Sequence, residues 1–177
     1  MDALARLLAR DEIRELAHRY AVALDARDLD ALVALFVEDV RVGREASGRD
    51  ALRRDFDRQL RAIGVSILFV ASQVVDFDDA DHARGIVYCL AEIADADRWI
   101  RQAIRYDDSY ARRDGRWLFV RRRHRLFYGE EQPTNPMSQP PAHWPRSHTG
   151  RGTLPDELES WQRFWGRGEA GKMEGTR

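Results

Sequence analysis

The sequence is poor in cysteine and in long apolar runs. Its 177 residues include one cysteine, Cys89, which excludes an intramolecular disulfide framework and gives no indication of an oxidising compartment. No stretch approaches the roughly 20 apolar residues of a membrane-spanning helix, and the acidic segment after Met1 lacks the apolar run of a signal peptide. We therefore expect a soluble, cytoplasmic protein without a membrane partner.

An excess of charge of one sign is also missing. The chain has 29 Lys and Arg against 30 Asp and Glu, a net charge of −1. This balance creates no field that would attract nucleic acid, so we expect no nucleic-acid partner. With 44% hydrophobic residues, a chain of this length suits one globular domain around one core.

The order of the hydrophobic patterns predicts an α+β fold. Apolar residues recur every three to four positions in the N-terminal third, and long β-branched and aromatic runs follow after Gly64. Asp28 is placed as a helix N-cap, and Asp114-Gly115 is the strongest hairpin signal. Helices are expected at residues 3–25, after Asp28 and at 50–62, and strands at 65–77, 83–94, 98–113 and 116–128. Three helices followed by an antiparallel meander differ from an alternating βαβ pattern.

The C-terminal part differs in composition. All six prolines lie between Pro133 and Pro155. Aromatic residues that need a surface to cover lie among and after them: Trp144, Trp161, Phe164 and Trp165. We expect residues 1–128 to form the domain and 129–177 an extension that packs on the domain or on a partner subunit. Within it, a short helix is expected near 155–165 and a frayed end after about residue 168.

Strand alternation singles out Arg122 and His124. Side chains of a strand alternate between its two faces, so these two share one row. The rest of that row is apolar: Leu118, Val120, Leu126 and Tyr128. Polar groups in an apolar row must be paired or hydrated, and a ligand pocket provides both conditions. The alternatives are a buried salt bridge to carboxylates on the helices, or a face that is simply exposed.

Asp25 and Tyr20 are the candidates on the first helix. Asp25 lies at the helix end, where a carboxylate is unfavourable, and burial there would raise its pKa and make it a usable base. Tyr20, one turn earlier on the apolar face, could donate a phenolic hydrogen bond into the same cavity. The alternatives are a carboxylate that bonds its own turn and an ordinary core tyrosine.

Metal-ligating patterns are weak. The acidic run from Asp76 to Asp81 lacks the glycine and the final glutamate of a calcium loop. His143 and His148 have no further ligands nearby, so we expect no metal. Cys89 has no basic neighbour and is interpreted as a small core residue.

Four segments of the chain together resemble a known family. They are Tyr20–Asp28, Leu35–Val40, Ser47–Asp50 and Tyr110–Trp117, and they are similar to the SnoaL-like branch of the nuclear transport factor 2-like (NTF2-like) superfamily. The resemblance covers about residues 5–128 and implies a cone-shaped fold, with N-terminal helices packed on a curved, mainly antiparallel sheet around a deep apolar pocket. Relatives in this branch, such as scytalone dehydratase, bile-acid 7α-dehydratase and hexachlorocyclohexane dehydrochlorinase, are cofactor-free lyases, and dimers or trimers are common among them.

The resemblance also assigns site residues. Asp25 falls on the family's catalytic aspartate, Tyr20 on a dehydratase tyrosine, and Arg122 on a pocket arginine. The family's catalytic histidine begins a segment of the form His-Phe-Val-x-Asn, and here that segment reads Leu68-Phe69-Val70-Ala71-Ser72. The Asp–His dyad is therefore absent in its usual form.

These observations favour a cofactor-independent lyase of the dehydratase type, or an isomerase, that acts on a hydrophobic small molecule. Asp25, His124 and Tyr20 would carry the chemistry. Arg122, Leu68, Ser72 and Glu92, a reserve acid in the second long strand, would bind substrate. His124 could replace the missing histidine, or Asp25 could act alone. The alternative is a small-molecule-binding protein without turnover, and in either case we expect a homodimer or homotrimer.

Overall fold

The computed structural model describes residues 1–138 and 152–173, with side chains up to residue 166. The helices are α1 (Ala3–Asp25), α2 (Leu29–Ala34), α3 (Arg49–Arg61) and α4 (Glu159–Met173), with a 3-10 turn η1 (Pro136–Ser138). The long strands are β3 (Ser66–Phe77), β4 (His82–Asp95), β5 (Arg98–Arg113) and β6 (Arg116–Gln132), and a small hairpin pairs β1 (Arg41–Val42) with β2 (Ala46–Ser47). No described helix is long and apolar enough to cross a membrane.

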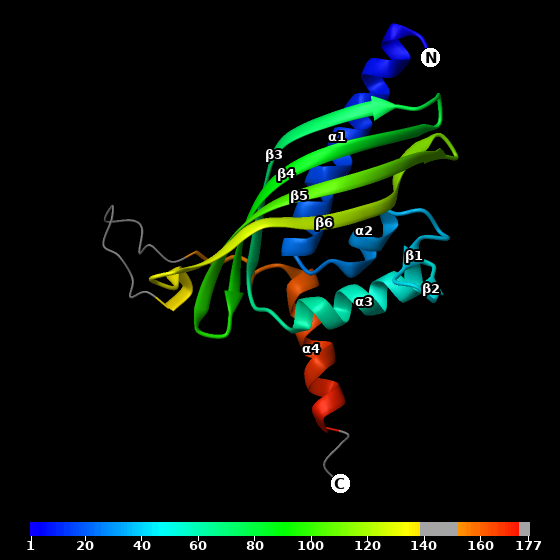
Figure 1. Cartoon of the computed structure of the whole chain (residues 1–177). Helices are drawn as coiled ribbons and strands as arrows, with labels where there is room; N and C mark the ends of the chain where they lie inside the picture. Colours follow the sequence, from blue (N-terminus) through cyan, green and yellow to red (C-terminus); the bar gives the residue numbers. More distant parts are fainter. Residues whose placement is uncertain (139–151, 174–177) are drawn as a thin grey trace.

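The long strands form one antiparallel sheet in the order β3-β4-β5-β6. Figure 1 shows the sheet curving around α1, with α2 and α3 beside it. The predicted α+β fold, with N-terminal helices on an antiparallel meander, is thus confirmed. The tight turn at Asp114-Gly115 is confirmed as well, because both residues have the positive φ (50° and 78°) that such a turn requires. Strand β6 runs past residue 128 to Gln132, so the expected domain boundary falls inside a strand.

Helix capping places the end of α1 and the start of α2. Asp2 caps α1, and the carboxylate of Asp28 accepts a hydrogen bond from the amide of Ala31 as the predicted N-cap of α2. Between the two helices Arg27 has a φ of 56°, in the left-handed region. This abrupt turn leaves Asp25 as the last residue of α1 and brings Arg27 inward, where it is 2% exposed.

The core lies between the helices and the inner face of the sheet. Ile13, Leu32 and Phe119 are fully buried in it. The segment after α2 joins the sheet through a parallel bridge in which Phe119 donates to the carbonyl of Leu35 and accepts from the amide of Val37. This bridge holds the helical layer against β6 and keeps the two layers in a fixed relation.

Two β-bulges interrupt the alternation of β6. The pairing with β5 shifts between Ser109 and Tyr110 and again between Ala103 and Ile104. The expected row is therefore correct for Arg122 and His124 and wrong at its ends. At one end Phe119, from the opposite row, pairs with Tyr110 and is fully buried, and at the other Tyr128 pairs with Ala103 and is 50% exposed. Each extra residue in a bulge moves the following side chains to the other face.

Helix α4 packs on the end of α3, as Figure 1 shows at the base of the molecule. Phe164 is buried in the main core, and its carbonyl accepts a hydrogen bond from Arg61. Ser160 donates to the carbonyl of Ala26, directly after α1. The helix is longer than the expected 155–165. Trp144, His143, His148 and the last four residues lie outside the described residues.

Candidate functional site

A cavity of about 1270 Å³ lies between the helices and the inner face of the sheet. Its walls come from α1, from the segment after α2, from α3 and from all four long strands. Most of the lining is apolar, for example Leu24, Phe56 and Ile104. The polar side chains on the wall include Tyr20, Ser66, Gln102, Tyr106, Arg122 and His124. The deep, mostly apolar pocket that the family resemblance implies is present.

Asp25 lies behind the wall of this cavity, bonded to two residues that line it. Its Oδ2 accepts a hydrogen bond from the backbone amide of Leu68 at 2.9 Å, and its Oδ1 accepts one from the hydroxyl of Ser66 at 3.2 Å. Both donors belong to β3 and line the cavity. Burial raises the pKa of Asp25 to about 6, although the two hydrogen bonds and the charge of Arg27 act in the opposite direction. The expected rise in the pKa of this carboxyl is confirmed.

Arg27 is connected to Asp25 through Ser66. Its Nη1 donates to the hydroxyl of Ser66 at 2.8 Å and to the carbonyl of Leu24 at 2.7 Å, and its Nη2 donates to the carbonyl of Gly64. Burial lowers the pKa of this guanidinium to about 10, against the raising effect of Asp25. It remains a cation at neutral pH, so a buried positive charge lies one hydroxyl away from the candidate base.

Arg122 forms a buried ion pair with Asp108 of β5. Its Nε and Nη2 donate to the two carboxylate oxygens at 3.0 and 2.8 Å, and the side chains are 4% and 0% exposed. Burial acts to lower the pKa of Arg122, but the carboxylate outweighs it, so the pKa lies above its ordinary value. The salt-bridge alternative is thus correct, although the carboxylate comes from the sheet and not from a helix. Arg122 also lines the cavity.

Tyr20 lies in an aromatic cluster around Arg122. The guanidinium carbon of Arg122 is 4.3–4.5 Å from the ring centres of Tyr20, Tyr106 and Phe119. Burial raises the pKa of Tyr20 to about 12, with a smaller lowering effect from Arg122. The phenol is therefore protonated at every physiological pH and can act as a hydrogen-bond donor.

His124 lines the cavity on β6, next to Tyr106, with ring centres 5.7 Å apart. Burial lowers its pKa below the ordinary value, so it is neutral at pH 7. Within the described part of the chain, His124 shares no hydrogen bond with Asp25, whose carboxylate is bonded to Ser66 and Leu68. The two residues belong to one site but form no direct dyad.

Two expected pocket residues lie elsewhere, and these predictions are wrong. Ser72 falls in a bulge of β3, where the pairing shifts between Val70 and Gln73, and it is exposed. Glu92 alternates with Ala91 and Ile93, which line the cavity, so it occupies the outer face and pairs with Arg101 at 2.9 Å.

Leu68 does reach the site. Its side chain lines the cavity and its amide holds Asp25. Cys89 is 3% exposed, and burial raises the pKa of its thiol to about 11, in agreement with a core role.

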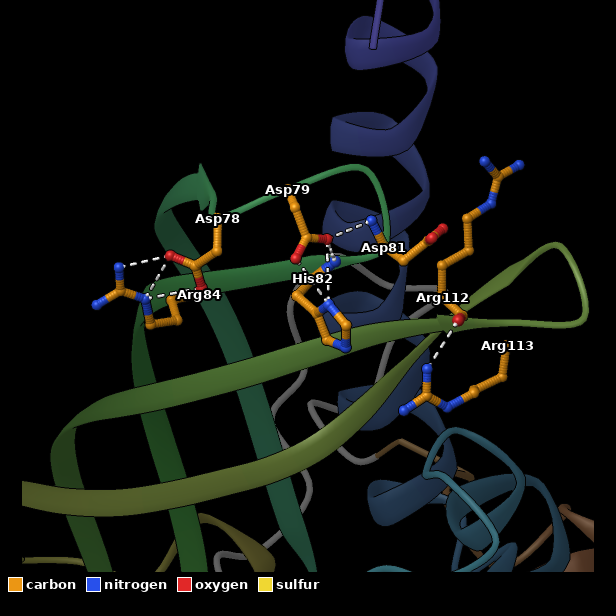
Figure 2. A network of polar contacts seen from close by, with 7 residues as sticks. All are labelled: Asp78, Asp79, Asp81, His82, Arg84, Arg112 and Arg113. Atoms are coloured by element: carbon orange, nitrogen blue, oxygen red, sulfur yellow. Dashed lines mark hydrogen bonds and ion pairs between the residues drawn. The ribbon is translucent and has the colours of Figure 1, made fainter.

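The acidic turn between β3 and β4 is satisfied by its own neighbours (Figure 2). The carboxylate of Asp78 accepts hydrogen bonds of 2.6–3.0 Å from Nε and Nη2 of Arg84. The carboxylate of Asp79 accepts from the backbone amides of Asp81 and His82. Among the described residues there is no group of three or more His, Cys, Asp or Glu that could hold a metal ion. The network stabilises a surface turn.

The sequence reasoning missed Arg27, Ser66 and Asp108. Asp108 could have been found from the sequence. It is a charged residue in a strand row with Ile104, Tyr106 and Tyr110, and the same pattern singled out Arg122. Nothing in the sequence indicated that Arg27 is buried, because its burial depends on the left-handed backbone conformation of Arg27 itself.

The family model of the SnoaL-like domain matches residues 5–123. The chain belongs to the SnoaL-like family. The expected branch is thus confirmed, and β6 beyond Arg123 and helix α4 lie outside the matched segment. No curated protein matches the chain.

Solved structures agree with this assignment. A scytalone dehydratase-like protein from Novosphingobium aromaticivorans is 22% identical, with a TM-score of 0.66 over 78% of this chain and 99% of that one. Hexachlorocyclohexane dehydrochlorinase LinA-type3 from Novosphingobium barchaimii is 22% identical, with a TM-score of 0.67 over 75% and 95%. An NTF2-like protein with a cystatin-like fold from N. aromaticivorans is 30% identical, with a TM-score of 0.56 over 70% and 85%. The fold is that of the NTF2-like superfamily.

Proposed function

We propose that the protein is a cofactor-independent lyase of the dehydratase type, or an isomerase, that acts on a hydrophobic small molecule. The observation that carries this proposal is Asp25, a half-buried carboxyl with a pKa near 6 that is hydrogen-bonded to Ser66 and Leu68 in the wall of a large, mostly apolar cavity. A group with this pKa is roughly nine tenths ionised at pH 7 and is still a better base than an ordinary carboxylate. The similarity of the chain to dehydratase and dehydrochlorinase structures supports the same class of reaction.

The chemistry begins with removal of a proton by Asp25. The carboxylate takes the proton from a substrate carbon, and the electron pair of the broken C–H bond forms a new double bond. In an elimination the bond to the leaving group on the adjacent carbon breaks: a hydroxyl departs as water with the proton that Asp25 returns, and a halide departs as an anion while Asp25 releases its proton to solvent. In an isomerisation the existing double bond shifts, and Asp25 returns the proton to its far carbon. The leaving or carbonyl oxygen then needs a hydrogen-bond donor. The protonated phenol of Tyr20 and the neutral imidazole of His124 line the same cavity and supply this role.

The cavity indicates the substrate class. Its largely apolar walls favour a substrate with a hydrophobic body, and Tyr106, Arg122 and His124 supply polar groups on the sheet side. Because Asp108 neutralises Arg122, this buried arginine favours a neutral oxygen function of the substrate over a free carboxylate or phosphate.

One observation favours the second candidate, a binding protein without turnover. Leu68 stands where the family resemblance places the catalytic histidine, and Asp25 has no hydrogen bond to an imidazole among the described residues. A chain that has lost catalysis would keep the apolar cavity and its aromatic wall while its carboxylate became dispensable.

The variant Asp25→Asn separates the two candidates. For a lyase we expect turnover of a panel of hydrophobic hydroxy- and halo-compounds to fall by at least about 10²-fold, with ligand affinity unchanged within about tenfold. Wild-type turnover should rise as pH increases through about 6, since Asp25 must lose its proton. Asp50→Asn, an exposed acid in the first turn of α3, is the matched control. Tight binding without turnover of any compound would favour the binding protein.

We also propose a homo-oligomer that uses the outer face of the sheet. Phe69, Leu90 and Tyr128 lie in one cross-strand row with Ala103, and they are 44–54% exposed. Arg125 and Glu130 lie on β6 on either side of this row, so a two-fold arrangement of copies brings opposite charges together. Light scattering should show a dimer that Leu90→Glu dissociates, and a trimer would contradict this two-fold arrangement.

A further inference from the structure

Helix α4 lies beyond the SnoaL-like match, yet it reaches the surroundings of Asp25. The ring of Trp161 covers the guanidinium of Arg27, with 4.9 Å between the guanidinium carbon and the ring centre. The hydroxyl of Ser160 donates a hydrogen bond of 2.8 Å to the carbonyl of Ala26. Ala26 is the residue between Asp25 and Arg27 in the chain. Two consecutive residues of α4 are therefore fixed on the two residues that follow the candidate base.

Arg27 is held on every side. Three carbonyl or hydroxyl oxygens accept from its two terminal nitrogens, from Leu24, Ser66 and Gly64. Its Nε is buried without a hydrogen-bond partner among the described residues, and the Trp161 ring covers the guanidinium. An arginine enclosed in this way has one available position, and its charge acts through a medium of low effective dielectric.

Ser66 transmits this position to Asp25. Because its hydroxyl accepts from Arg27, its single proton is available for the Oδ1 of Asp25. The hydrogen bond to Asp25 therefore has a fixed direction as long as Arg27 stays in place. The other groups coupled to Asp25 are the amide of Leu68, the phenol of Tyr20 and the thiol of Cys89. Arg27 is the one cation in this described set.

We propose that Arg27, held in place by Trp161 of α4, is a positioning residue that orients Ser66 and keeps the carboxylate of Asp25 ready to accept a proton. This inference rests on the proposed role of Asp25 as a base. It makes α4, which lies outside the segment matched by the family model, a part of the site. Loosening the contact between Trp161 and Arg27 should change the proton affinity of Asp25 although neither residue lines the cavity.

The test is a carbon-13 NMR titration of the Asp25 carboxyl in the full chain. Arg27→Met removes the cation and the donor to Ser66, so we expect the midpoint to rise by at least about one pH unit. Ser66→Ala, a small change that preserves the fold, should raise it less. Arg27→Lys keeps the charge and should restore part of the difference. Arg84→Met is the control, since this arginine is 70% exposed and pairs with Asp78 in the turn between β3 and β4.

The role of α4 is tested by a double-variant comparison. Trp161→Leu should move the midpoint of Asp25 in the wild-type background and leave it unchanged in the Arg27→Met background. An equal shift of the midpoint in both backgrounds, or no shift in either background, would overturn the role of α4. If Arg27→Met does not fold, Ser66→Ala and Trp161→Leu decide: midpoints within about 0.3 pH unit of wild type overturn the proposal. The titration needs no substrate, so a protein without turnover would refute the proposed lyase and leave this result standing.

Discussion

The domain contains two buried pairs of arginine and aspartate that differ in one respect. Arg122 and Asp108 bond directly through three hydrogen bonds, and both are almost completely buried. Arg27 and Asp25 meet through the hydroxyl of Ser66, and Asp25 remains half-buried with its pKa raised to about 6. In the first pair each charge compensates the other. In the second pair Arg27 compensates the charge of Asp25 only in part, so the carboxylate of Asp25 keeps the basicity that proton transfer needs.

The largest effect is expected from breaking the direct pair. Asp108→Asn leaves the guanidinium of Arg122 buried without a counter-charge and also weakens the hydrogen bond from Tyr110. We expect a loss of about 3–5 kcal/mol in the free energy of unfolding, measured by urea denaturation. Glu92→Gln is the control, because its partner Arg101 is 44% exposed, and it should cost less than about 1 kcal/mol. Equal losses in both variants would remove the distinction between a buried pair and a surface pair.

A smaller effect of opposite sign is expected at Asp25. Its pKa rises from 3.8 in the unfolded chain to about 6 in the fold, so the folded state binds more protons between these values. Stability therefore falls as pH rises through this window, and the penalty is complete above pH 6. Asp25→Asn should stabilise the protein by about 1–2 kcal/mol at pH 8 and have little effect at pH 4. Urea denaturation at both pH values checks this, and a destabilisation at pH 8 would show that Asp25 is a structural group.

The smallest effect is expected at the acidic turn between β3 and β4. Arg84 and Asp78 form a two-pronged ion pair in solvent, where water and salt screen both charges (Figure 2). Arg84→Ala should leave the urea midpoint unchanged within the error of the measurement. A clear shift would mean that geometry alone, without burial, is enough to make such a pair stabilising in this fold.

Much of the fold could be predicted because its signals are local. The helical period of α1, the N-cap at Asp28 and the turn at Asp114-Gly115 depend on residues within a few positions of one another. The burial and basicity of Asp25 followed from its place at the end of an apolar helix. Arg122 and His124 were found by strand alternation, since no bulge separates the two positions.

The errors lie where alternation is interrupted or where it could not choose a face. The bulge in β3 placed Ser72 in solvent, and the orientation of β4 placed Glu92 on the outer face. A bulge depends on how two strands meet, so a single-strand pattern cannot show it. A pattern of alternate residues likewise does not say which row is the inner one.

By itself the sequence determined the order of the elements, the turn residues between them and the presence of a carboxylate at the end of α1. The tertiary structure decided which charges are compensated. Asp108 meets Arg122 because the register of β5 on β6 aligns them, and Trp161 covers Arg27 because α4 returns to the end of α1. The physical reason is that desolvation and Coulomb energy depend on distances across the fold. Periodicity along the chain carries no information about those distances.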